Sequence, residues 1–170
     1  MTATTLRPFE QADLAVTIAM QCRAVDRLGR SHYTDDETAL LIAASREPDY
    51  AEALSGNDLW LAVDPAGAIV GSAGWGAMAA EAGSAAPRGR IRKVFVEPAL
   101  AGQGLGRVLV EAAQARAVAA GCRGFMVRAN LNAVPFYQRL GYRVTRAGSL
   151  VVGDRSLPMT MMEKPVEIGV

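Results

Sequence analysis

A strand, a glycine-rich turn and a helix follow one another in the middle of the chain, and this succession constrains the fold more than any other feature. Val94–Val96 is a β-branched and aromatic run, typical of the end of a buried strand, and Pro98 ends it because proline cannot donate to a sheet ladder. Apolar residues at helical spacing follow from Leu105. Three alternate glycines form the turn between them: Gly102, Gly104 and Gly106. Bare backbone N–H groups at the start of a helix favour a phosphate or pyrophosphate, so the sequence predicts an anion-binding turn.

The turn differs from the two common nucleotide-binding motifs. Its glycines run G-x-G-x-G, whereas the dinucleotide fingerprint requires G-x-G-x-x-G. Arg107 follows the last glycine, where a Walker A loop has lysine and then serine or threonine. A tight strand-to-helix connection without any ligand is the alternative interpretation of the glycines alone.

Composition limits the classes of protein. The chain has 170 residues, 51% of them hydrophobic and 21% charged, which predicts a single globular domain, 1–170. A net charge of +1 gives no overall basic field for nucleic acid. Cys22 and Cys122 form no CxxC pair, and no signal peptide or membrane-spanning run is evident, so a reducing, cytoplasmic location is expected. One histidine and scattered acids predict no metal site.

Periodicity and turn residues predict alternating helices and strands. The expected strands are 5–8, 58–63, 68–75, 90–96, 125–128, 142–145 and 158–163. The expected helices are 10–28, 34–45, 48–54, 105–121 and 133–141, the second starting with the capping-box pattern of Thr34 and Glu37. Residues 78–87 are small and predict an exposed loop.

A second motif lies after the glycine turn. Residues 130–142 have the pattern N-x-x-A-x-x-F-Y-x-x-x-G-Y, and residues 94–107 are V-F-V-E-P-A-L-A-G-Q-G-L-G-R. In order and separation the two motifs resemble the GCN5-related N-acetyltransferase (GNAT) superfamily. The resemblance implies an α/β fold of the α+β type, with a mixed, mostly antiparallel central sheet flanked by helices. The sheet would splay to hold acetyl-CoA, in a binding core at about residues 90–142.

The resemblance also implies a set of acetyl-CoA contacts. Phe95 and Val96 would offer main-chain groups to the pantetheine and the acetyl carbonyl. Asn130 would contact the pantetheine arm or an ordered water, with Asn132 as a stand-in; an Asx turn that caps the next helix is the alternative. Ala101 departs from the family, which usually has Gln or Arg there, and Arg107 or Gln103 can supply the missing contact. The pyrophosphate would be held by the turn: Gly102, Gln103, Gly104, Leu105, Gly106 and Arg107.

By the same resemblance, Tyr137 is the general acid that protonates the departing thiolate. The alternative is a core tyrosine packed on Phe136 and Leu140. Many family members place a glutamate on the strand before the glycine turn, but the comparable place here is Arg90, and residues 90–93 contain no carboxylate. A water chain or a partly neutral amine would then replace a protein base. An arginine-rich strand can instead attract an acidic acceptor, although a solvated strand face is the simpler interpretation.

Aromatic side chains are the candidates for the acceptor pocket: His32, Tyr33 and Trp75, with Trp60 placed in the core. The sequence thus predicts an acetyl-CoA-dependent N-acetyltransferase in which an amine attacks the thioester directly, since neither motif contains a cysteine. The acceptor would be a small-molecule amine or a protein N-terminus or lysine, and the resemblance is compatible with a homodimer, because dimers are common in the family. A non-catalytic acyl-CoA-binding or sensing module is the alternative, and a nucleotide-binding protein unrelated to CoA is the third hypothesis.

Overall fold

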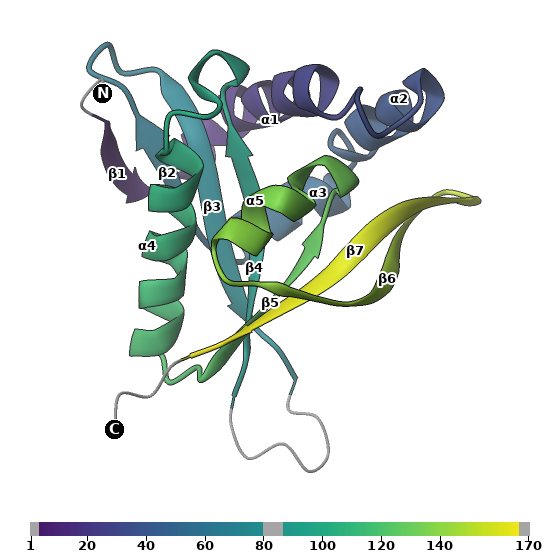
Figure 1. The fold of residues 1–170 in the computed structure, drawn as a ribbon. Coiled ribbons are helices and arrows are strands. Elements are labelled where there is room, and N and C mark those ends of the chain that lie inside the picture. The colour runs from purple at the N-terminus through teal and green to yellow at the C-terminus, as the bar shows by residue number, and fades with distance from the viewer. Residues whose placement is uncertain (1–3, 80–86, 167–170) are drawn as a thin grey trace.

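One seven-stranded sheet organises the chain in the computed structural model, which describes residues 4–79 and 87–166 (Figure 1). The strand order is β1-β2-β3-β4-β5-β7-β6, and β4 and β5 are the parallel pair in an otherwise antiparallel sheet. The strands are β1 (Thr5–Pro8), β2 (Asp58–Val63), β3 (Ile69–Ala77), β4 (Gly89–Val96), β5 (Gly124–Ala129), β6 (Arg143–Val152) and β7 (Arg155–Pro165). The predicted fold class, a mixed and mostly antiparallel sheet flanked by helices, is confirmed.

Helices cover both faces of the sheet. The longest on one face is α4 (Leu105–Ala119), with the short α5 (Val134–Arg139) beside it, and both contribute to one apolar core (Figure 1). The opposite face carries α1 (Leu14–Leu28), α2 (Asp35–Ala44) and α3 (Pro48–Ser55). Single 3₁₀ turns precede α1, α4 and α5: η1 (Gln11–Asp13), η2 (Pro98–Leu100) and η3 (Leu131–Ala133). None of the helices in the described part of the chain is both long and apolar enough to cross a membrane.

The sheet splays between β4 and β5. Their paired residues run only from Gly89 opposite Phe125 to Ile91 opposite Val127. Beyond Ile91, β4 keeps its other neighbour, β3, with Phe95 opposite Ser72 and Val96 opposite Gly71. The β5-facing edge of the last part of β4 is therefore free of strand pairing.

A bulge in β4 is held by a buried hydrogen-bond network. Lys93 has a φ of +56°, and its carbonyl accepts a hydrogen bond from the Ser72 hydroxyl at 2.7 Å. The Gln21 amide donates to Ser72 Oγ at 3.0 Å, and the Tyr50 hydroxyl donates to Gln21 Oε1 at 2.6 Å. A bulge inserts one extra residue and re-aims the side chains that follow. As a result Val94 packs toward the α4 core, as Ile91 does, while Lys93 joins Arg92 on the opposite face.

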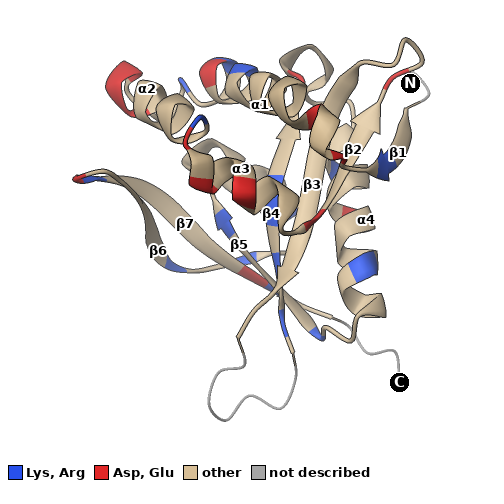
Figure 2. Cartoon of the chain, turned by 180° about the vertical axis from the view of Figure 1, so that it is seen from behind, with Lys and Arg blue, Asp and Glu red and all other residues tan. Residues whose placement is uncertain are grey.

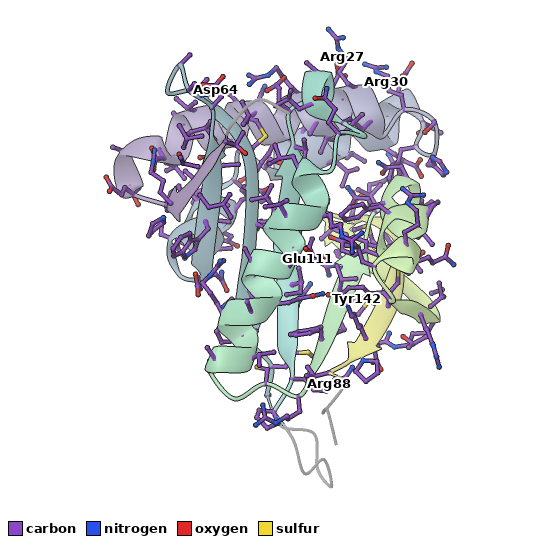
Figure 3. All side chains as sticks on the ribbon, turned by 60° about the vertical axis from the view of Figure 1, so that its left-hand side comes forward. Arg27, Arg30, Asp64, Arg88, Glu111 and Tyr142 are labelled. Carbon is purple, nitrogen blue, oxygen red and sulfur yellow. The ribbon has the colours of Figure 1, made fainter. Side chains whose placement is uncertain are left out.

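The core beneath α4 is closely packed. Leu109, Val110 and Ala113 are buried on the helix face that meets the sheet. Gln114 donates to the hydroxyl of Tyr142 at 2.7 Å and so satisfies the buried phenol. Figure 3 shows Tyr142 between α4 and the C-terminal strands. This packing fixes where α4 begins relative to the end of β4.

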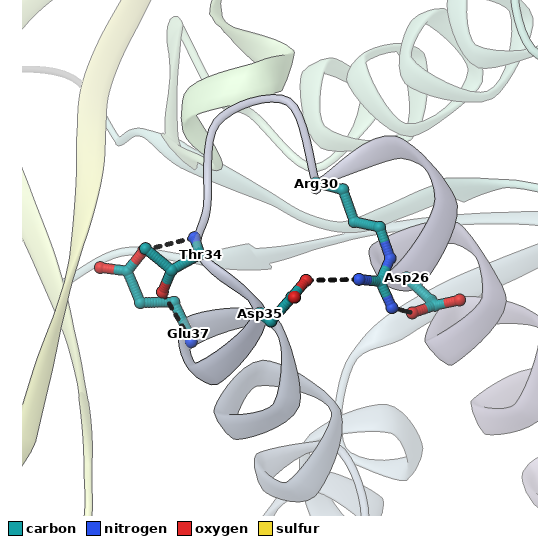
Figure 4. Close-up of polar contacts among 5 residues, drawn as sticks. All are labelled: Asp26, Arg30, Thr34, Asp35 and Glu37. Atoms are coloured by element: carbon teal, nitrogen blue, oxygen red, sulfur yellow. Dashed lines mark hydrogen bonds and ion pairs between the residues drawn. The ribbon is translucent and has the colours of Figure 1, made fainter.

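Local charges and a cap fix the loop between α1 and α2. Arg30 forms ion pairs with Asp26 and with Asp35 (Figure 4). The Thr34 hydroxyl accepts from the Glu37 N–H, and the Glu37 carboxylate accepts from the Thr34 N–H at 2.9 Å, which is the predicted capping box (Figure 4). The loop therefore holds a definite position at the edge of the sheet.

The last hairpin is longer than the pattern predicted. Strands were expected at 142–145 and 158–163, but β6 and β7 extend to meet across Gly153. Residues 146–152 pair with β7 alone and are mostly exposed, so they show no strong apolar alternation. The expected loop at 78–87 lies largely outside the described residues.

Candidate functional site

Two clefts meet where β4 and β5 separate. The first cleft, of about 550 Å³, lies between the end of β4, the glycine turn, the α1–α2 loop and α5. The second cleft, of about 570 Å³, lies between β4, β5, α3 and the β6–β7 hairpin. Phe95 and Asn130 line both clefts. The two clefts therefore share a wall at the splay.

The glycine turn forms one end of the first cleft. Gly102 and Gly104 have φ values of +78° and +90°, in the left-handed region that favours glycine, and Gly104 is the N-cap of α4. The first N–H groups of an α-helix have no intrahelical partner, and within the described chain Leu105, Gly106 and Arg107 find none elsewhere. A Cβ on Gly106 would lie 3.3 Å from the Phe136 ring. The turn thus presents unobstructed donors, as an anion requires.

Not every predicted residue of the turn faces the cleft with its side chain. Leu105 is buried in the α4 core, and the Gln103 amide donates to the carbonyl of Ala99 at 3.1 Å, in its own loop. Arg107 lines the first cleft, where its Nε donates to Glu111 at 2.7 Å and both side chains are exposed. Ala101 also lines the cleft. Arg107 is thus better placed than Gln103 to replace the contact that Ala101 lacks.

Asn130 directly follows β5 and lines both clefts. Its side chain makes no capping hydrogen bond to the following η3 turn, so the alternative interpretation of Asn130 as an Asx cap finds no support within the described residues. Asn132 lines the first cleft, and its Oδ1 is buried without a hydrogen-bond partner in the described part of the chain. Buried amide oxygens are normally satisfied, so both asparagines are available to a ligand.

Tyr137 extends from α5 into the wall of the second cleft. It is 4% exposed and packs edge-on against Phe136 and Tyr142, with ring centroids 5.0 and 5.3 Å apart. Burial, assisted by Tyr142, raises the pKa of Tyr137 well above its ordinary value. Its hydroxyl makes no hydrogen bond to the residues that the structure describes. The phenol therefore stays protonated and has a proton to donate.

The predicted acceptor residues are divided by the fold. His32 and Tyr33 line the first cleft rather than the second. The Tyr33 hydroxyl donates to the carbonyl of Pro158 at 2.9 Å and accepts from the Leu131 N–H at 3.0 Å, so it joins the α1–α2 loop to β7 and η3. His32 is exposed, with Nδ1 2.7 Å from the Ser31 hydroxyl.

The tryptophans lie away from both clefts. The Trp75 indole donates to Asp58 at 2.8 Å, and the Arg116 guanidinium lies 4.6 Å from the centre of the Trp60 ring. Arg116 also bonds to Asp58, at 3.0 Å. The structure thus gives Trp75 a place in a polar cluster on β2, β3 and α4 and does not bring it together with the other predicted site residues. A tryptophan between glycines fits a cleft wall or a sheet face equally well in sequence.

Four basic side chains line the second cleft, and the sequence pattern did not place Arg128 beside the other three. Arg90, Arg92 and Lys93 come from β4 and Arg128 from β5, and all are half-buried. Burial and the neighbouring Arg128 and Arg92 lower the pKa of Arg90 to about 10. Burial and the same arginine cluster lower the pKa of Lys93 to about 7. Arg128, between the apolar Val127 and Ala129, was the signal that sequence reasoning missed.

The structural neighbours are acetyltransferases. A GCN5-related N-acetyltransferase structure from Rhodopseudomonas palustris is 24% identical, covers 98% of both chains and has a TM-score of 0.83. The PaiA N-acetyltransferase from Thermoplasma acidophilum, in complex with coenzyme A, is 14% identical and covers 96% of this chain and 99% of its own, with a TM-score of 0.75. A phosphinothricin acetyltransferase from Sinorhizobium meliloti, in complex with acetyl-CoA, is 20% identical and covers 98% and 89%, with a TM-score of 0.65. At these identities the likeness shows the fold.

Sequence comparison gives the family. The acetyltransferase (GNAT) domain model matches residues 30–164. The uncharacterized N-acetyltransferase YjcF of Bacillus subtilis is 30% identical over 76 residues, 45% of this chain, and the match spans about half (53%) of that protein. Because the family model covers most of the chain, the protein belongs to the GNAT acetyltransferase family. The recognition made from the two motifs is confirmed.

Proposed function

We propose that the protein is an acetyl-CoA-dependent N-acetyltransferase in which an amine attacks the thioester directly in a ternary complex. The observation that carries this proposal is the splay of β4 and β5. It joins a cleft that ends in a glycine turn to a second cleft that contains a buried, protonated tyrosine. The family to which the chain belongs and the coenzyme A and acetyl-CoA held by two of its structural neighbours support the same assignment.

The first cleft suits the acetyl-CoA. The free N–H groups at the start of α4 would hold the pyrophosphate, and the unpaired edge of β4 at Phe95 and Val96 would bond the pantetheine amides. Asn130 and the unpartnered oxygen of Asn132 are further polar contacts for the arm. The thioester would then lie near the wall that the two clefts share.

Acetyl transfer requires a neutral amine and a protonated leaving group. The amine nitrogen bonds to the thioester carbon, the carbon–sulfur bond breaks, and the thiolate takes the proton of the Tyr137 hydroxyl. The amine gives up one proton to solvent and the phenolate is reprotonated. A thiol has a pKa of roughly 8.5 and a phenol one of roughly 10, and burial raises the pKa of Tyr137 further. Proton donation from Tyr137 to the departing sulfur is therefore uphill on its own and would take place as the carbon–sulfur bond breaks. The described carboxylates that line the second cleft, Glu47 and Asp49, are exposed at the start of α3, so water rather than a buried base would accept the amine proton.

The test is thiol release from acetyl-CoA with a panel of amines. Tyr137→Phe should lower turnover by about 10²-fold or more, since general acid catalysis is lost, and leave acetyl-CoA affinity unchanged. Tyr142→Phe is the matched control, because it is an equally buried tyrosine whose hydroxyl is bonded to Gln114. It should keep turnover within a few fold. Full turnover in Tyr137→Phe would remove this residue from the mechanism.

A non-catalytic acyl-CoA sensor is the second candidate function. Ala101 and the absence of a carboxylate in β4 favour it. Tight acetyl-CoA binding without thiol release for any amine would establish the sensor in place of the enzyme. An absence of binding would contradict both.

A further inference from the structure

The second cleft places four cations around one cavity. Arg90, Arg92 and Lys93 lie along β4, and Arg128 lies on the neighbouring β5. Figure 2 shows the basic residues on β4 and β5, in the region framed by α3 and the β6–β7 hairpin. The bulge brings Arg92 and Lys93 to the same face, because without it Lys93 would point toward the α4 core. The cluster is therefore a product of the network that holds the bulge.

These cations lack protein anions. None of the ion pairs formed among the described residues includes Arg90, Arg92, Lys93 or Arg128. Glu47 and Asp49 line the same cavity but are exposed at the start of α3.

Part of the guanidinium hydrogen-bonding capacity is also unused. The Nε atoms of Arg90 and Arg92 are buried without an acceptor in the described part of the chain. One Nη of Arg92 donates a hydrogen bond to Asn57 Oδ1 at 2.8 Å, and one Nη of Arg128 donates to the carbonyl of Ser149 at 3.3 Å. Buried donors are normally satisfied, so the cavity lacks an acceptor.

The electrostatics of the second cleft also favour a bound anion. Burial and the repulsion among these cations lower the pKa of Arg90, Lys93 and Arg128. The Lys93 ammonium lies 3.1 Å from the centre of the Tyr50 ring, which gives it a partial counter-charge only. A bound anion would relieve both the repulsion and the unsatisfied donors, and the arginine fork matches carboxylate and phosphate oxygens.

We propose that the second cleft binds the acceptor through an anionic group, so that the acceptor is a small amine carrying a carboxylate, a phosphate or a phosphonate. This inference rests on the proposed function, because it names the acceptor of that reaction. An anion held by Arg90 and Arg128 would leave the amine directed toward Phe95 and Asn130, the wall shared with the first cleft. Tyr137 lies in the same cavity.

The experiment compares matched amines with acetyl-CoA in thiol release. The pairs are alanine and alaninamide, β-alanine and β-alaninamide, phosphoethanolamine and ethanolamine, and aminomethylphosphonate and methylamine. We expect KM to be about tenfold or more lower for the anionic member of at least one pair, since a charge-assisted hydrogen bond is lost in the neutral one. The carboxylate and phosphorus pairs separate the two kinds of anion. Equal or better turnover of every neutral member would overturn the proposal.

Substitutions of Arg90 and Arg128 test whether these residues bind the anionic group of the acceptor. Arg90→Gln and Arg128→Gln should raise KM for the preferred amine by about tenfold or more and leave the Kd of acetyl-CoA unchanged. Arg90→Lys should recover part of the affinity. The control is Arg123→Gln, an exposed arginine on the loop before β5 that lies outside both clefts.

A stability measurement distinguishes binding from a structural role. Because Arg90 makes no ion pair in the described chain, Arg90→Gln should leave the melting temperature unchanged or raised. A lowered melting temperature with an unchanged KM would mean that Arg90 only supports the fold, and would overturn its assignment.

A binding measurement distinguishes the failure of the anion site from the failure of the proposed enzymatic function. If no amine releases thiol, the proposed function fails, and calorimetry with inorganic phosphate and with succinate decides the anion site. Binding of either probe that is lost in Arg90→Gln supports the site without the reaction. No binding of either probe to the wild-type protein, or binding unaffected by Arg90→Gln and Arg128→Gln, overturns it.

Discussion

Gly104 shows how one residue can matter to stability and to binding separately. It has a φ of +90°, and a Cβ there would meet no protein atom within 4 Å. Gly67, in the β2–β3 turn, has a φ of +86° and the same open surroundings, but it lies outside the first cleft. The two glycines therefore share the conformational requirement and differ in location.

Gly104→Ala and Gly67→Ala should each destabilise the fold by about 1–2 kcal/mol, because an L-residue is strained in the left-handed region. Gly104→Ala alone should weaken acetyl-CoA, since its Cβ and any backbone shift fall within the turn that would hold the pyrophosphate. Denaturant unfolding and calorimetry with acetyl-CoA measure the two effects. Equal acetyl-CoA affinity in both variants would contradict a cradle at Gly104.

At the scale of the element, the bulge in β4 depends on Ser72. This hydroxyl is fully buried and links Gln21 to the carbonyl of Lys93. The bulge determines both the course of Phe95 and Val96 along the first cleft and the position of Lys93 in the second. A single buried hydroxyl thus supports both halves of the site.

Ser72→Ala should destabilise the fold by about 1–3 kcal/mol, because it leaves the Gln21 amide and the Lys93 carbonyl without a partner. Ser55→Ala is the control, since its hydroxyl bonds to Gln11 at the exposed end of α3 and should change the free energy of unfolding little. Urea unfolding gives both values. A Ser72→Ala protein as stable as wild type would show that the bulge does not depend on this network.

At the scale of the whole molecule, the cation cluster should make the free energy of unfolding depend on pH. The pKa of Lys93 is about 7 in the fold, against roughly 10.4 in an unfolded chain. Above pH 7 the unfolded state therefore binds more protons than the folded state, and the free energy of unfolding should rise with pH. The charged groups that line the cavity with Lys93 are Arg90 and Arg92 on its own strand, Arg128 on β5, and Glu47 and Asp49 at the start of α3.

The rise should be visible between pH about 7 and about 8.5, below the range in which the buried Cys122 thiol and the tyrosines, whose pKa values burial raises, reverse the trend. Lys93→Met removes the titrating group and should flatten the curve. Thermal melts of both proteins across this range are the measurement. A slope that persists in Lys93→Met would assign the titration to another group.

The local motifs could be predicted from the sequence because they depend on residues that are neighbours along the chain. The glycine turn needs left-handed backbone at Gly102 and Gly104, the capping box needs Thr34 and Glu37 three residues apart, and both occur as predicted. The resemblance extended these motifs to a mixed sheet, splayed between β4 and β5, and the structure has that sheet. The far end of the β6–β7 hairpin could not be predicted, because an exposed strand that pairs on one side only shows little alternation of apolar and polar residues in its sequence.

The two clefts were decided by contacts between residues far apart in the chain. Sequence alone determined the family, and it predicted an anion site at the glycine turn and a general acid at Tyr137. Each of these rests on a run of about a dozen residues. Only the tertiary structure shows that Tyr33 is buried and hydrogen-bonded to Pro158 and Leu131, and that Trp75 is hydrogen-bonded to Asp58. It also brought Arg128 beside the β4 cations, through a parallel pairing and a bulge held by Ser72. Strand register and side-chain direction depend on pairing across the sheet, and that information is not present in any single stretch of the chain.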